Sequence, residues 1–143
     1  MAYSKKGLEL TERFEGCRLT PYRDVGGIWT DGYGNTIGVV PGVLISQELA
    51  EAELARNTQT AVDAVNRLVT VPLTQPEFDA LVDFVFNCGS GNFAKSTLLR
   101  DLNASNFAAA ANEFQKWDLA AGKHVAGLLR RRLAEKQEFQ ETV

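Results

Sequence analysis

The chain has 143 residues, of which 45% are hydrophobic and 23% are charged, and its formal net charge is -3. This length and composition are typical of one globular domain with its own core, and they exclude a disordered tail or a disulfide scaffold. The negative charge argues against a nucleic-acid binder, which normally carries a basic surface. We therefore expect no nucleic-acid partner.

Targeting and redox features are sparse in this sequence. Residues 1–20 contain no apolar run typical of a signal peptide, and later apolar runs are too short to span a bilayer. We therefore expect no stable membrane association. Cys17, Cys88 and the single histidine, His124, fit two free thiols better than a disulfide or a zinc site. We expect neither a metal nor a cofactor.

The first third of the chain changes from a helical pattern to a glycine-rich one. Ser4 is a predicted N-cap, and Gly16 is a predicted stop, so Glu15 falls in the last turn of the first helix. Residues 18–43 hold six glycines, two prolines and several β-forming residues. This composition predicts short strands joined by tight turns.

Helical periodicity returns after this segment. Ser46 is predicted to cap a long helix that extends to Leu68. Thr74 and Glu77 form a capping box, with Pro76 in the first turn of the next helix. Further helices are predicted at residues 96–102, 105–117 and 128–139. The expected fold class is α+β, mostly α, with one small β element.

Two carboxylates near the N-terminus suggest glycoside cleavage, which needs one protonated acid and one ionised carboxylate. Apolar neighbours of Glu15, Phe14 and Leu19, favour its protonated form, whereas a neighbouring arginine and a glycine-rich turn favour the ionised form of Asp24. Thr30 offers a hydroxyl that could hold a water molecule. The spacing alone is weak support, because most of the 18 acidic residues in such a chain are surface charges.

Three segments in order along the chain carry a more specific signal. They are Phe14–Asp24 with residues 29–36 (WTDGYGNT), residues 81–102, and Trp117–Arg132. Together these segments resemble the phage-type lysozymes of glycoside hydrolase family 24, the endolysins. That family is marked by a Glu, an Asp nine positions on and a Thr six beyond that, and Glu15, Asp24 and Thr30 match this spacing.

The resemblance implies a lysozyme-like α+β fold with two lobes. A small β lobe would cover about residues 14–58, and a helical lobe would cover about residues 59–143 together with the N-terminal helix. A long helix would join them, and the substrate would bind in a cleft between them. The implied reaction is hydrolysis of the β-1,4 bond between N-acetylmuramic acid and N-acetylglucosamine in bacterial peptidoglycan, with inversion at the anomeric carbon.

The resemblance also implies roles for single residues. Glu15 would be the general acid, Asp24 the charged partner and Thr30 the group that positions water. The implied substrate-binding residues are Tyr33, Asn35, Asn87 and Gly89. The protein would be a monomer that accumulates in the host bacterial cytoplasm until a holin admits it to the cell wall, which it then digests to lyse the host.

Two positions depart from the family pattern. Asn35 stands where a histidine is usual, and Asp31 stands where Ile or Val is usual. In a strand Asp31 points away from Thr30, and a charge in a packing position is costly unless it is solvated or paired. We therefore expect Asp31→Ile to raise stability, activity or both. If the backbone bends instead, Asp31 could enter the cleft and repel Glu15.

Three alternatives remain open at this point. The chain could be an inactive peptidoglycan-binding or regulatory module with the lysozyme shape, or an amidase or peptidase that pairs Cys17 or Cys88 with His124. The basic stretch Lys123–Arg132 could bind peptidoglycan carboxylates or could form structural ion pairs. Trp117 is expected to belong to the core.

Overall fold

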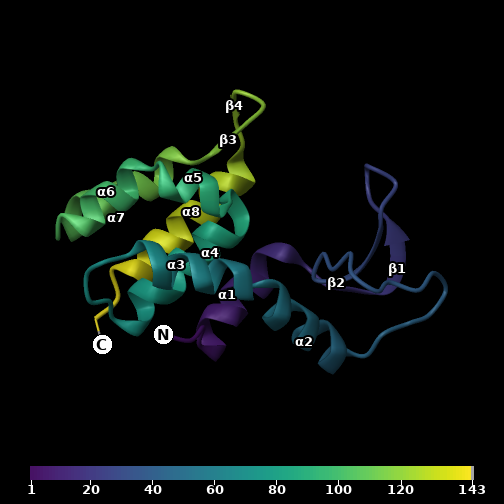
Figure 1. Cartoon of the computed structure of the whole chain (residues 1–143). Coiled ribbons are helices and arrows are strands. Elements are labelled where there is room, and N and C mark those ends of the chain that lie inside the picture. The colour runs from purple at the N-terminus through teal and green to yellow at the C-terminus, as the bar shows by residue number, and fades with distance from the viewer. Residues whose placement is uncertain (143) are drawn as a thin grey trace. The chain divides into compact units, whose positions relative to one another are not determined.

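The computed structural model describes residues 1–142, which form two compact units (Figure 1). Residues 8–59 form the unit that we call the β unit. Residues 1–7 group with the chain from residue 60 onward in the helical unit. The sequence-based division placed the whole N-terminal helix with the helical lobe, whereas in the structure most of that helix groups with the β unit.

The β unit contains most of the first helix, a hairpin and a second helix. Its elements are α1 (Lys5–Glu15), β1 (Arg18–Arg23), β2 (Trp29–Gly32) and α2 (Gln47–Asn57). The predicted cap of α1 is confirmed, since the Ser4 hydroxyl accepts a hydrogen bond from the Gly7 N–H at 3.1 Å. The predicted stop is also confirmed, because Gly16 has φ +68° and donates to the Glu12 carbonyl.

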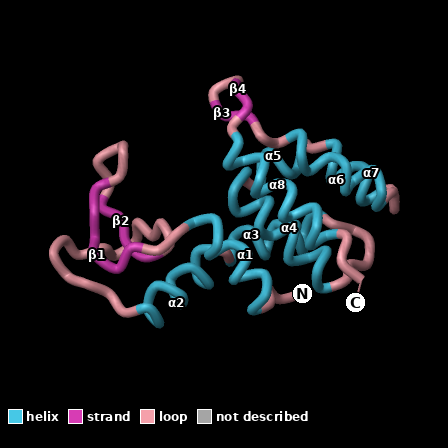
Figure 2. Tube along the Cα trace, turned by 180° about the vertical axis from the view of Figure 1, so that it is seen from behind, coloured by secondary structure: helices cyan, strands magenta, loops and turns pink. Residues whose placement is uncertain are grey.

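The strands β1 and β2 form an antiparallel hairpin, drawn in magenta in Figure 2. Tyr22 lies opposite Thr30, and the register is irregular between Arg18 and Tyr22. After β2 the chain turns back at once, and Asp31 and Asn35 exchange two backbone hydrogen bonds of 2.9 Å. The predicted strands therefore exist, but residues beyond this turn form loops up to α2.

The predicted long helix after Ser46 is wrong in its continuity. Ser46 does cap α2, since its hydroxyl accepts from the Leu49 N–H at 3.0 Å. The helix ends at Asn57, and α3 (Gln59–Leu68) follows after Thr58. The hydroxyl of Thr58 donates to the Ala55 carbonyl at 2.9 Å, and such a side-chain bond to a preceding carbonyl competes with the regular helical pattern.

The helical unit contains most of the other helices and a second small hairpin. Its further elements are α4 (Gln75–Cys88), α5 (Ser90–Ala94), α6 (Thr97–Asn103), α7 (Phe107–Glu113), the 3₁₀ turn Phe114–Lys116, β3 (Leu119–Ala120), β4 (Lys123–His124) and α8 (Ala126–Phe139). The capping box of α4 is confirmed at Thr74 and Glu77. The short helix α5 and the β3–β4 hairpin were not expected from the sequence.

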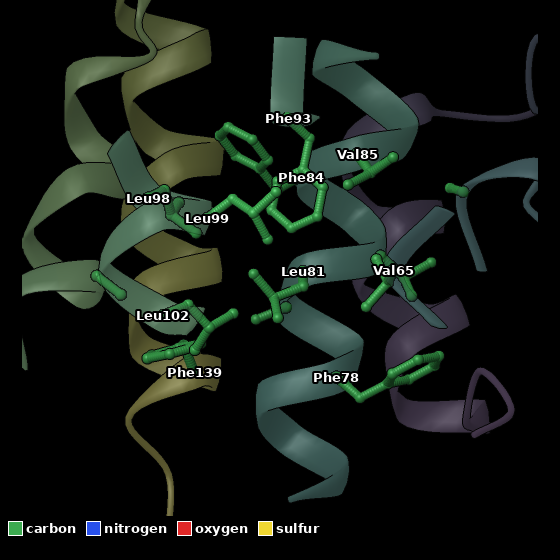
Figure 3. Close-up of a cluster of buried hydrophobic side chains, with 14 of the residues drawn as sticks. Val65, Phe78, Leu81, Phe84, Val85, Phe93, Leu98, Leu99, Leu102 and Phe139 are labelled. Carbon is green, nitrogen blue, oxygen red and sulfur yellow. The ribbon is translucent and has the colours of Figure 1, made fainter. Parts of the chain in front are cut away.

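The core of the helical unit surrounds α4. Phe78, Leu81 and Phe84 of this helix are fully buried, as the predicted stripe requires, and they pack among buried side chains of α3, α5, α6 and α8 (Figure 3). Trp117 is half-buried and meets Phe84 edge-on, with 5.5 Å between the ring centroids.

Together, these helices and the small hairpins confirm the predicted mostly helical α+β fold. No helix in the described part of the chain is long and apolar enough to cross a membrane.

Candidate active site

Glu15 is placed by the end of α1. It is the last helical residue and is half-buried, and the positive φ of Gly16 turns the chain away immediately after it. Its carboxyl group lies beside the turn that follows β2. A Cβ atom added to Gly34 would lie only 3.6 Å from Glu15 Oε1. Glu15 therefore lies next to the segment from Thr30 to Gly34.

Asp24 is held by the turn between β1 and β2. Its Oδ1 accepts hydrogen bonds from the Gly26 and Ile28 N–H groups, both at 2.9 Å. Its backbone N–H donates to the Ile28 carbonyl, also at 2.9 Å. An Asp side chain that bonds to the backbone two residues on is a typical turn-forming device. The turn therefore fixes one carboxylate oxygen, while no hydrogen bond within the described residues engages Oδ2.

Thr30 lies in β2 of the hairpin, opposite Tyr22 of β1. Asp24 directly follows β1, and its backbone pairs with Ile28, two residues before Thr30. Thr30 is 4% exposed, and its hydroxyl donates to the Ile28 carbonyl at 2.9 Å. With its proton engaged in this way, the hydroxyl oxygen can still accept a hydrogen bond from water.

Asn35 lies at the centre of a buried polar cluster. Its Nδ2 lies 2.9 Å from Asp31 Oδ1, 3.0 Å from Glu53 Oε2 and 2.9 Å from the Ile37 carbonyl oxygen. Its Oδ1 accepts from Arg56 at 2.9 Å. Asn35 is 1% exposed, and both polar atoms of its side chain are engaged within the protein. This burial argues against a direct contact with substrate, so we leave Asn35 out of the proposed binding residues.

Asp31 is buried and hydrogen-bonded. It is 2% exposed, its Oδ1 accepts a hydrogen bond of 2.9 Å from Asn35 Nδ2, and its carboxyl group interacts with that of Glu53. From the sequence, a charge at this position was expected to be costly unless it was solvated or paired. In the structure the side chain is not solvated, and its partners are an amide and a second carboxyl group. Isoleucine could not accept the hydrogen bond from Asn35, and the gain expected from Asp31→Ile stays a prediction.

Sequence reasoning missed Glu53 altogether. The pKa of Glu53 is raised from 4.5 to about 7. Burial is the largest cause, a hydrogen bond and the charge of Asp31 act in the same direction, and Arg56 opposes the shift. The signal that could have revealed this residue is the spacing of Glu53, Arg56 and Asn57. Positions i, i+3 and i+4 share one face of a helix, and here that face is polar where a core would be apolar.

Tyr33 lies in the turn between Asp31 and Asn35 and is half-buried. Its hydroxyl oxygen accepts a hydrogen bond of 2.8 Å from Gln47 Nε2, and burial raises its pKa. The Cys17 thiol lies 3.8 Å from Gln47 Oε1. Tyr33 therefore presents a fixed phenol close to the candidate catalytic residues in the chain.

The other predicted binding residues belong to the helical unit. Asn87 is exposed near the end of α4, and its Oδ1 accepts from Arg132 at 2.8 Å. It lines a surface cavity of about 280 Å³ together with Trp117 and Arg132. Gly89 follows α4 with φ +96°, a conformation that favours glycine.

The basic stretch of the sequence is partly structural. Arg131 makes two hydrogen bonds with Asp83, of 3.0 and 2.9 Å, and Arg132 lies 2.8 Å from Glu135. Asp83, Arg132 and Glu135 are fully buried, and Arg131 is nearly so. Two of the four basic residues between positions 123 and 132 therefore neutralise buried carboxylates and present no charge to an anionic polymer.

The arrangement of cysteines and histidine gives no support to an amidase. Cys17 and Cys88 are free thiols, and burial raises the pKa of both, which disfavours the nucleophilic thiolate. His124 Nδ1 lies 2.8 Å from Asp118 Oδ2, so its partner is a carboxylate. Within residues 1–142, no hydrogen bond joins either thiol to this imidazole.

Comparisons with known proteins agree with this geometry. A family model described as phage lysozyme matches residues 12–135. The endolysin of Acyrthosiphon pisum secondary endosymbiont phage 1 is 43% identical over 98% of this chain and 99% of its own length. The endolysin of Salmonella phage P22 is 41% identical over 97% of this chain and 98% of its own. A crystal structure of a P22 lysozyme mutant superposes with a TM-score of 0.92 at 38% identity, covering 99% of each chain.

Proposed function

The chain belongs to the phage lysozyme family and is a muramidase, and we propose that it hydrolyses the β-1,4 bond between N-acetylmuramic acid and N-acetylglucosamine with Glu15, Asp24 and Thr30 as its catalytic residues. The observation that carries this proposal is their common location. Glu15 lies beside Gly34, and Asp24 and Thr30 belong to the hairpin that leads to Gly34. Two carboxyl groups and one hydroxyl thus belong to a single compact unit.

The proposed reaction assigns one task to each group. Glu15 donates its proton to the glycosidic oxygen as the bond from this oxygen to the anomeric carbon breaks. Asp24, with Oδ1 held by two N–H groups, supplies a fixed negative charge that stabilises the positive charge developing on the sugar. Thr30 accepts a hydrogen bond from the water that attacks the anomeric carbon, and the Asp24 carboxylate takes up the proton that this water loses. Attack from the opposite face of the sugar gives inversion.

A cell-wall digestion tests the proposal. Purified peptidoglycan is incubated with wild type, Glu15→Gln and Glu9→Gln, and new reducing ends are counted against new free amines. Glu9 is an exposed carboxylate on the same helix and serves as the matched control. We expect reducing ends from wild type and Glu9→Gln, and a loss of at least about 100-fold in Glu15→Gln. Free amines in place of reducing ends would overturn the proposal.

The substrate contacts are a further part of this proposal. Tyr33 offers a phenol held by Gln47, and Asn87 offers an exposed amide at a surface cavity. Gly89 offers backbone groups without a side chain to cover them. We expect Tyr33→Phe and Asn87→Ala to raise KM more than they lower kcat, because lost binding that is equal in the ground state and the transition state changes KM alone.

The biological role that we propose is host cell lysis by a monomer that reaches the wall from the host cytoplasm through a holin lesion. The support is the similarity to proteins named endolysins. Expression in a bacterial host with and without a holin tests the role. Rapid lysis only in the presence of the holin is the expected result, and lysis at the same rate without it would refute the dependence.

A further inference from the structure

The orientation of the Asn35 side chain is set by its donors. Its Oδ1 accepts hydrogen bonds from Arg56 Nη2 at 2.9 Å and from Asn57 Nδ2 at 3.1 Å. If the amide were flipped, its NH₂ group would face these N–H donors without an acceptor. The amide nitrogen must therefore point to the opposite side, toward Asp31 and Glu53.

The acceptors around this nitrogen outnumber its protons. An amide carries two N–H protons, but three oxygens lie within 3.0 Å of Asn35 Nδ2, and two of them belong to the carboxyl groups of Asp31 and Glu53. The second oxygen of Glu53, Oε1, is buried and accepts no hydrogen bond from the described residues. Such surroundings suit a carboxyl group that carries a proton better than an ionised one.

The nearby charges do not remove the need for this proton. Arg56 on α2 is the cation that acts on Glu53, and its guanidinium is already bonded to Asn35 Oδ1. Outside α2, the Cys17 thiol interacts electrostatically with Asp31, and it also interacts in this way with Glu12 and Glu51. Two adjacent buried carboxyl groups beside one cation favour a state in which one of them is protonated. The pKa of about 7 for Glu53 places the loss of this proton near neutrality.

The cluster is directly joined to the candidate catalytic residues. Asp31 follows Thr30 in β2, and its two backbone hydrogen bonds to Asn35 close the turn that carries Gly34. Gly34 in turn lies next to the Glu15 carboxyl. Glu53 also packs tightly against this turn, because a Cβ on Gly32 would lie 2.9 Å from Glu53 Oε1. A second negative charge in the cluster would repel Asp31, and this repulsion would displace the segment between Thr30 and Gly34.

From this geometry we propose that Asp31 and Glu53 are positioning residues, whose carboxyl groups share one proton while the Asn35 amide donates to both, and which so hold the segment from Thr30 to Gly34 in place for hydrolysis. The proposal rests on the proposed function, because it assigns a role to Thr30 and Glu15. Its consequence is that the wild-type enzyme loses turnover on the alkaline side as the shared proton dissociates. Glu53→Gln retains a neutral group of the same shape at every pH.

The test combines kinetics with NMR on the full chain. We measure kcat and KM on soluble peptidoglycan fragments from about pH 5 to about pH 9 for wild type, Glu53→Gln and Glu48→Gln. Glu48 is an exposed carboxylate on the same helix and is the matched control. The kcat of Glu53→Gln relative to wild type should rise by at least about threefold over this range, since misplacing a catalytic group by about 1 Å can cost about 100-fold. KM should change little, and the Glu48→Gln ratio should stay constant.

The NMR measurement does not depend on activity. In wild type the amide signals of Thr30 and Gly34 should titrate with a common midpoint near neutral pH. This step should be absent from Glu53→Gln, and Asp31→Asn should move its midpoint to lower pH, because the neighbouring carboxyl group that opposes ionisation of Glu53 is removed. If both amides titrate identically in wild type and Glu53→Gln, or if the kcat ratio is independent of pH, the proposal is wrong. A wild type that releases no reducing ends would instead refute the proposed function and leave the NMR result to decide the proton sharing.

Discussion

Replacing Glu53 by glutamine should make the protein more stable at neutral and alkaline pH. The side chain is 8% exposed, and its Oε2 lies 3.0 Å from Asn35 Nδ2. Glutamine has the same shape, can accept this hydrogen bond through its carbonyl oxygen and can donate to Asp31 through its amide. The substitution therefore mimics the protonated carboxyl group and removes only its ability to ionise.

The size of the effect follows from the pKa of Glu53. In the folded protein this pKa is about 7, against an ordinary value of 4.5. Each pH unit between the two values corresponds to 1.36 kcal/mol, so the full effect is about 3 kcal/mol. Between these values the folded state binds more protons than the unfolded state, so the stability of wild type falls as pH rises. Below about pH 4.5 this contribution is fully present, and above about pH 7 it is lost.

Urea denaturation at a series of pH values provides the assay. The free energies of unfolding of wild type and Glu53→Gln should be similar near pH 4.5, and the variant should be more stable by about 3 kcal/mol near pH 8. Comparing two proteins at each pH cancels the titration of groups that both contain. Glu48→Gln, measured in parallel, should differ from wild type by a constant amount. A difference between Glu53→Gln and wild type that does not vary with pH would refute the reasoning.

Three further predictions concern packing, ion pairing and capping, and urea denaturation measures all of them. Gly32→Ala should lower the free energy of unfolding by about 2–3 kcal/mol, because φ is +53° and the new methyl group would contact α2. The control Gly42→Ala, at φ +82° in open space, should lower it by only about 1–2 kcal/mol. Equal losses would contradict the role of close packing. Arg131→Met should lower the free energy of unfolding by about 3–5 kcal/mol, because it leaves Asp83 buried without this cation. Adding Asp83→Leu should recover part of this loss. If the double variant recovers nothing, the uncompensated charge is not the cause. Thr74→Ala should lower the free energy of unfolding by about 1 kcal/mol, because the helix cap is lost. An unchanged urea midpoint would show that the capping box does not contribute to stability.

The parts of the fold that were predicted correctly depend on neighbours in the chain. The caps at Ser4, Ser46 and Thr74 each join a side chain to a backbone N–H three residues later, and Gly16 ends a helix by its own backbone conformation. Such interactions are visible in a window of a few residues. The break at Thr58 was missed because helical spacing continues through it, and the side chain that disturbs the helix bonds to a carbonyl only when the helix has formed.

The candidate site divides in the same way. Glu15, Asp24 and Thr30 were named from motifs in the sequence, and the glycine-rich composition predicted the turns that hold them. What only the tertiary structure decided is the environment of Asp31 and Asn35. Their partners Glu53 and Arg56 are about 20 positions away in the chain, and no local pattern specifies that contact. The cost of burying a charge depends on which distant groups surround it. The sequence therefore named the candidate catalytic residues, while the packing of α2 against the hairpin decided the surroundings of Asp31 and Asn35.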